Sequence, residues 1–157
     1  MLRIFSYALT ILALTAVGAV GADNSLGTWK LSIESSSYIP APFPVKSLTV
    51  MREEAPGGVK VTVTGERADG TPINASYTAK YDGSWAAVSG TGTPYDSIAI
   101  KQVNDHEFTY LAKQTNGPYR ASGRIEVAKD GKRLTQSAKG KDATGKAMQI
   151  TLIYDKK

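Results

Sequence analysis

The sequence has no cysteine and only one histidine among its 157 residues. Without cysteine, neither disulfide bonds nor thiolate-bound metals can hold the fold together. His106 stands beside the turn dipeptide Asn104-Asp105, and one histidine does not readily collect the ligands of a histidine–carboxylate metal site. We therefore expect no metal, no other cofactor and a fold that rests on its hydrophobic core.

Recognisable catalytic patterns are also missing. The chain has no Gly-x-Ser-x-Gly nucleophile elbow, and Gly90-Thr91-Gly92 lacks the lysine and following helix of a phosphate-binding loop. The carboxylates of Glu53 and Glu54 are neighbours on an expected strand, so they point to opposite faces. The basic C-terminal region has Tyr154 as its only aromatic residue, whereas single-stranded nucleic acid needs several stacking rings. We expect neither an enzyme nor a nucleic-acid-binding protein.

Positive charge is concentrated near the C-terminus. The formal net charge is +5, and residues 129–157 contain eight lysines or arginines against three aspartates. A basic end could contact anionic lipid head groups at a membrane surface. Lysines on the outward face of strands also prevent strand edges from pairing with other chains, and we favour this second interpretation.

The long apolar run at the N-terminus differs from the rest of the chain. It extends from Ile4 to Val17 after the basic start Met1-Leu2-Arg3, and Val20 and Ala22 fit the −3 and −1 positions of a signal-peptidase site. A retained transmembrane anchor is the alternative, but glycines thin the run and no basic flank follows it. We predict a signal peptide at residues 1–22, a single domain at 23–157 and a secreted or periplasmic location. No cysteine is available for a lipid anchor.

Period-two alternation of apolar and polar residues dominates the remaining chain. It is clear in residues 59–64, 73–81, 119–127 and 148–154, and it indicates strands with one buried face. Turn dipeptides such as Asp69-Gly70 separate the strands, which suits hairpins. The expected strands cover residues 27–34, 45–53, 58–66, 72–81, 84–89, 96–103, 106–114, 118–128, 132–139 and 146–154.

A series of hairpin-connected strands leaves two open edges unless the sheet closes on itself. We therefore predict an all-β fold, an antiparallel up-and-down β-barrel of 8–10 strands.

Two segments interrupt the alternation of strands and turns. Residues 35–44 contain three prolines and must cross as an extended connection, and residues 90–95 are rich in glycine. Their apolar side chains could either form the rim of a barrel mouth or plug it.

The first predicted strand begins Gly27-Thr28-Trp29-Lys30-Leu31, and the chain ends near Tyr154-Asp155-Lys156. These features resemble the calycins, the superfamily of lipocalins and fatty-acid-binding proteins, and in particular small exported bacterial lipocalin-like proteins. The resemblance implies that Trp29 closes the barrel floor under a basic side chain, for which Arg120, Arg124 or Arg133 are candidates. Leu152 stands where fatty-acid-binding proteins place a carboxylate-binding arginine, and the helical lid is missing.

The expected inward positions combine small and aromatic side chains, which could leave room for one small ligand. Tyrosine hydroxyls would then provide polar anchors for a hydrophobic or amphipathic molecule. The alternative is a filled barrel that acts as a protein-binding scaffold or inhibitor through loops 35–44 and 89–96. We expect a monomer in either case. The candidate ligand-binding residues are Tyr77, Tyr81, Tyr110, Tyr119 and Tyr154.

Overall fold

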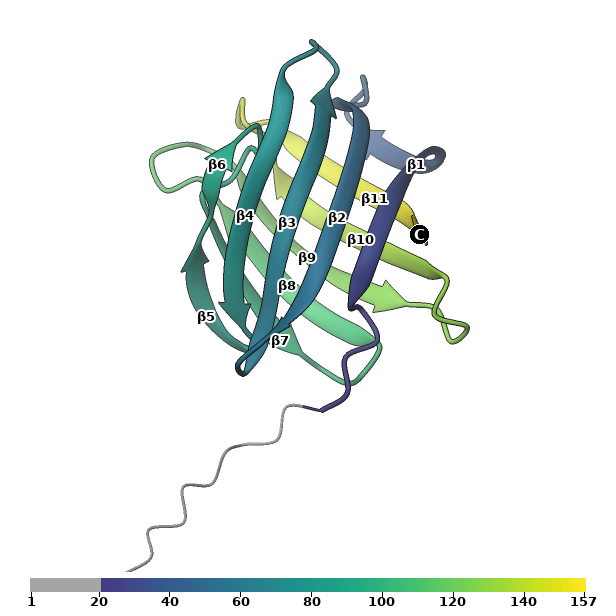
Figure 1. The fold of residues 1–157 in the computed structure, drawn as a ribbon. Coiled ribbons are helices and arrows are strands. Elements are labelled where there is room, and N and C mark those ends of the chain that lie inside the picture. Colours follow the sequence, from purple (N-terminus) through teal and green to yellow (C-terminus); the bar gives the residue numbers. More distant parts are fainter. Residues whose placement is uncertain (1–20) are drawn as a thin grey trace, which may run out of the picture.

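The alternating segments of the sequence form eleven antiparallel strands in one sheet, which curls into a nearly closed barrel (Figure 1). The computed structural model describes residues 21–157; the expected signal peptide lies outside them except for Gly21 and Ala22. The strands are β1 Gly27–Ile39, β2 Val45–Ala55, β3 Gly58–Arg67, β4 Pro72–Lys80, β5 Asp82–Ala87, β6 Ser89–Thr91, β7 Ser97–Gln102, β8 Glu107–Lys113, β9 Arg120–Val127, β10 Arg133–Lys141 and β11 Ala147–Lys156.

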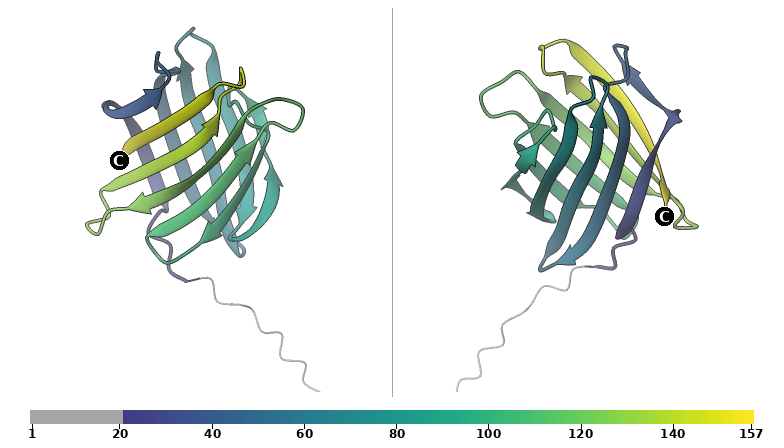
Figure 2. Two further views of the ribbon diagram at one scale, coloured as in Figure 1. Left: turned by 180° about the vertical axis from the view of Figure 1, so that it is seen from behind. Right: turned by 45° about the horizontal axis from the view of Figure 1, so that its top comes forward.

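The all-β, antiparallel barrel expected from the sequence is confirmed and is compatible with a calycin-like fold. It has eleven strands instead of the expected 8–10, because Gly90 and Thr91, predicted as loop residues, belong to the additional short strand β6. Its spatial order is β5-β7-β8-β9-β10-β11-β1-β2-β3-β4-β6, so β1 and β11 join the two halves of the chain. Neighbouring strands run in opposite directions, which places successive loops at alternate ends of the barrel (Figure 2). Within residues 21–157, no helix is long and apolar enough to cross a membrane.

The hairpin expected at Asp82-Gly83 does not form. Although β5 follows β4 after a single residue, β5 pairs with β7, and β4 pairs with the short strand β6 instead. The barrel is therefore incomplete between β4 and β5, which lie side by side without a hydrogen-bonded ladder. The chain does reverse its direction at this dipeptide, as predicted. The strand with which β5 pairs, however, is determined by the closure of the whole sheet.

The first strand is longer than expected. Residues 35–39, predicted as part of a loop, continue β1 after an irregularity between Ser32 and Ser37, and they pair with β11. The strand bends at this point, as Figure 2 shows. The hydroxyl of Ser36 supports the bend by accepting a hydrogen bond from the backbone N–H of Ile153 at 2.9 Å.

One end of the barrel is closed by the segment that precedes β1. Trp29 is fully buried there, and its indole N–H donates to the carbonyl oxygen of Ser25 at 2.7 Å. Nζ of Lys156 lies 5.2 Å from the centre of the Trp29 ring, so β11 supplies the basic cover rather than any of the three candidate arginines. Gly27 adopts a φ of 125°, and a Cβ there would lie 2.8 Å from Cε of Lys156.

Candidate functional site

A cavity of about 310 Å³ lies inside the barrel, above Trp29. This volume is at the lower end of the roughly 300–1,000 Å³ typical of ligand pockets. The wall is mainly apolar because the inward-facing positions of the strands carry branched aliphatic side chains. They include Val61, Val63, Ile98, Ile125, Leu134 and Ile150.

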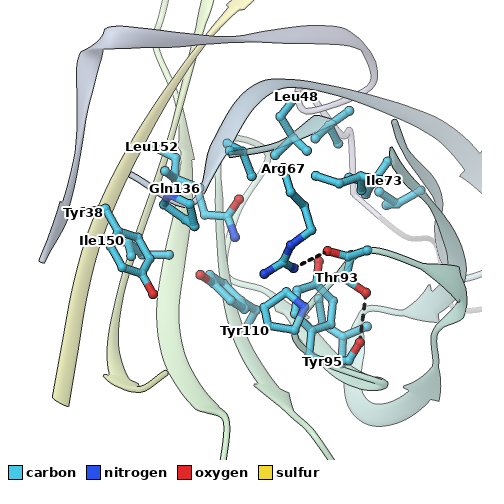
Figure 3. A pocket seen from close by; sticks show the side chains of 18 of the residues that line it. Tyr38, Leu48, Arg67, Ile73, Thr93, Tyr95, Tyr110, Gln136, Ile150 and Leu152 are labelled. Atoms are coloured by element: carbon cyan, nitrogen blue, oxygen red, sulfur yellow. Dashed lines mark hydrogen bonds between the residues drawn. The ribbon is translucent and has the colours of Figure 1, made fainter. Parts of the chain in front are cut away.

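The cavity opens at the end opposite the closed floor. Loops 40–44 and 142–146 lie there with segment 88–96, which contains the short strand β6, and exposed residues such as Thr144 belong to the cavity lining. Tyr38, Phe43 and Tyr95 also line it, so the aromatic residues of both unusual segments form the mouth. The rings of Tyr38 and Phe43 pack edge to face, with centroids 6.2 Å apart. Figure 3 shows Tyr38 and Tyr95 on different sides of the pocket.

Four of the five tyrosines selected from the sequence line this cavity, and Tyr81 does not. All four are buried, and the alternation along regular strands turns Tyr77, Tyr110 and Tyr154 inward. Tyr119 also packs against Tyr95 at the mouth, with ring centroids 6.0 Å apart. The lining tyrosines are Tyr77 on β4, Tyr110 on β8, Tyr119 just before β9, and Tyr154 on β11.

The hydroxyl of Tyr110 has an unusual environment. The residue is 4% exposed, and its hydroxyl has no hydrogen-bond partner within residues 21–157. Gln136 lies on the neighbouring wall of the pocket (Figure 3). Burial raises the pKa of Tyr110 to about 12, although the nearby side chain of Gln136 opposes this shift, and the hydroxyl remains protonated at neutral pH. Because an unpaired buried hydroxyl is costly, this group is ready to bond to a molecule in the cavity.

Among the polar lining residues that the sequence analysis missed, three lie on strands. Arg52, Arg67 and Gln136 lie on β2, β3 and β10 and line the cavity. A signal was available, because each continues the inward series of its strand: Arg67 follows Val61 and Val63 at intervals of two or four residues. The predicted strand ended at residue 66, which assigned Arg67 to a turn. Strand ends are the least reliable part of such a prediction.

Tyr81 belongs to a hydrogen-bond network in the floor. The buried Arg52 donates from Nε to Oγ of Ser25 at 2.9 Å and from Nη2 to the hydroxyl of Tyr81 at 3.4 Å. Both hydroxyls in turn donate to the carboxylate of Asp23. Two hydroxyls thus connect the arginine to a carboxylate, which compensates the burial of its charge.

His106 lies outside the cavity, at the floor end. Its Nδ1 is 2.8 Å from Oδ1 of Asp105, and its ring contacts the amide of Asn24, all at an exposed turn. In the part of the chain that the structure describes, no three histidine, cysteine, aspartate or glutamate residues are grouped as metal ligands.

Comparisons with known proteins do not add a family assignment. Neither the protein-family models nor the curated proteins give a match to this chain. The cavity and its polar groups are therefore the basis for assigning a function.

Proposed function

We propose that this protein is an exported, monomeric and non-catalytic binder of a small hydrophobic or amphipathic molecule, with the architecture of a lipocalin-like calycin. The observation that carries the proposal is the largely apolar cavity of about 310 Å³, open at one end of the barrel. Burial of a ligand's apolar surface against this wall supplies the driving force for binding.

The polar groups in the cavity support an amphipathic ligand. Tyr110 offers a buried hydroxyl without a partner among residues 21–157, and Gln136 offers an amide nearby. A ligand or water molecule that bonds to this hydroxyl removes the cost of leaving it unpaired. The size of the cavity favours a medium-length chain or a compact ring system.

A series of linear primary alcohols tests this proposal by isothermal titration calorimetry. Because burial of a methylene group contributes about 0.8 kcal/mol, each added methylene is expected to lower the Kd about fourfold until the chain fills the cavity. An absence of binding at every length, or a Kd independent of length, would contradict the proposal.

A pair of adjacent substitutions locates the binding. Leu152 lines the cavity, whereas the neighbouring Ile153 does not, because successive side chains on a strand point to opposite faces. Leu152→Trp fills the space and is expected to weaken binding of 1-decanol by roughly tenfold or more. Ile153→Trp makes a change of similar size outside the cavity and should leave the Kd within about twofold.

A further inference from the structure

Arg67 places a positive charge at the mouth of the cavity. It is the last residue of β3, it is half-buried, and its side chain lines the pocket. Its Nη1 donates a hydrogen bond to the carbonyl oxygen of Gly92 at 2.8 Å, which fixes the guanidinium beside the residue that follows β6. Figure 3 shows the side chain extending into the pocket.

The guanidinium retains unused donors. Arginine has five N–H groups, and within residues 21–157 no carboxylate lies within 4.0 Å of this side chain. Asp142 is the acidic residue in the cavity lining, but its Oδ1 is bonded by its own loop, including the backbone N–H of Thr144 at 2.8 Å and that of Lys146 at 3.0 Å. The two charges thus share the mouth without forming an ion pair.

Arg52, the second arginine of the cavity lining, already has a carboxylate to balance its charge. Arg52 is 4% exposed and is tied to Asp23 through the hydroxyls of Ser25 and Tyr81. An anion bound at the floor would compete with this carboxylate. The mouth therefore offers the better position for a ligand anion.

We propose that the ligand is a medium-chain anionic amphiphile, whose carboxylate pairs with Arg67 at the mouth while its apolar part fills the cavity below. This inference rests on the proposed function and names its ligand class. A guanidinium presents parallel N–H groups that match the two oxygens of a carboxylate. Tyr110 and Gln136 lie along the cavity and can bond to a hydroxyl or oxo substituent on the chain.

Decanoate and 1-decanol are suitable probes because they differ only in the head group. At pH 8, we expect the wild-type protein to bind decanoate about tenfold more tightly than 1-decanol in calorimetric titrations. Arg67→Gln should remove this preference by weakening decanoate binding about tenfold, with less than a twofold change for 1-decanol. Arg67→Lys keeps the charge without the paired donors and should retain part of the preference.

Arg120 provides the matched control. It lies at the same end of the barrel but is exposed, and its Nη1 bonds to three backbone carbonyl oxygens, those of Gln114, Gly117 and Tyr119. Arg120→Gln removes the same charge from the molecule without removing a group from the cavity lining. Its decanoate affinity should stay within about twofold of wild type at moderate ionic strength.

Asp142→Asn tests the same electrostatic argument by removing a negative charge near the expected position of the ligand carboxylate. Asparagine can still accept the loop hydrogen bonds at Oδ1, but the negative charge near the bound carboxylate is lost. Decanoate should bind two- to threefold more tightly to this variant, and 1-decanol should not change.

The outcomes separate this inference from the proposed function. If both probes bind equally well to the wild type and to Arg67→Gln, the anionic ligand is overturned while the hydrophobic carrier stands. If neither probe binds, both proposals fail. Thermal unfolding of each variant shows whether a lost affinity reflects a lost fold.

Discussion

At the scale of single residues, two buried tyrosines, Tyr81 in the floor network and Tyr110 in the cavity wall, have different hydrogen bonding. Tyr81 accepts from Arg52 and donates to Asp23, whereas the hydroxyl of Tyr110 has no partner within residues 21–157. A hydroxyl that connects a cation to a carboxylate stabilises the fold, and one without a partner only carries a cost of desolvation.

We expect Tyr81→Phe to lower the free energy of unfolding by about 1–3 kcal/mol, because it leaves groups of Arg52 and Asp23 without a partner. Tyr110→Phe removes a hydroxyl of the same kind and should leave the stability unchanged or raise it slightly. Urea denaturation of both variants measures the difference. Equal losses in the two variants would show that the floor network does not contribute in this way.

The buried tyrosines show how much of the site could be predicted from the sequence. Alternation correctly places Tyr77, Tyr110 and Tyr154 facing inward, because each lies within a regular strand. Tyr81 is also buried, but it lies between β4 and β5, where the chain leaves one ladder and enters another. Its hydrogen bonds depend on the segment before β1, a contact between distant parts of the chain that no local pattern predicts.

At the scale of elements, β9 and β10 approach each other closely around Gly123. This residue pairs with Ala138 on β10 and with Tyr110 on β8. A Cβ at Gly123 would lie 2.0 Å from the backbone oxygen of Ser137 and 2.7 Å from Cβ of Ala138. The strands would have to separate to accept any side chain here.

Gly123→Ala is therefore expected to lower the free energy of unfolding by about 1–3 kcal/mol, as overpacking typically does. Ser122→Ala on the same strand is the control, since Ser122 is exposed and its replacement should change stability by less than about 0.5 kcal/mol. Chemical denaturation compares the two variants. If Gly123→Ala left the free energy of unfolding unchanged, the strands around Gly123 could move apart at little cost, which would contradict this account.

Most strands could be predicted from the sequence because alternation and turn dipeptides are local signals. The pairing of β5 with β7 could not, since a turn at Asp82-Gly83 is compatible with either neighbour and the choice depends on closure of the sheet. The extension of β1 to Ile39 was also missed, because the nearby prolines suggested a loop while β11 provides a pairing edge.

At the scale of the whole molecule, the barrel has one closed and one open end. Trp29 and the Arg52 network fill the floor, whereas loops 40–44 and 142–146 and segment 88–96 surround the mouth. The apolar cavity lies between them, with Arg67 at its entrance. Under the proposed function, this polarity favours one orientation of an amphipathic ligand, with its chain toward the floor.

Methyl NMR of the protein saturated with 1-decanol tests the central claim most directly. Intermolecular nuclear Overhauser effects are expected between the alkyl chain and the methyl groups of Ile98, Ile125 and Ile150, which line the cavity. Ile39, 59% exposed and outside the cavity lining, should show none. Contacts confined to Ile39 or other outer residues, or no contacts with the interior at saturation, would contradict the account.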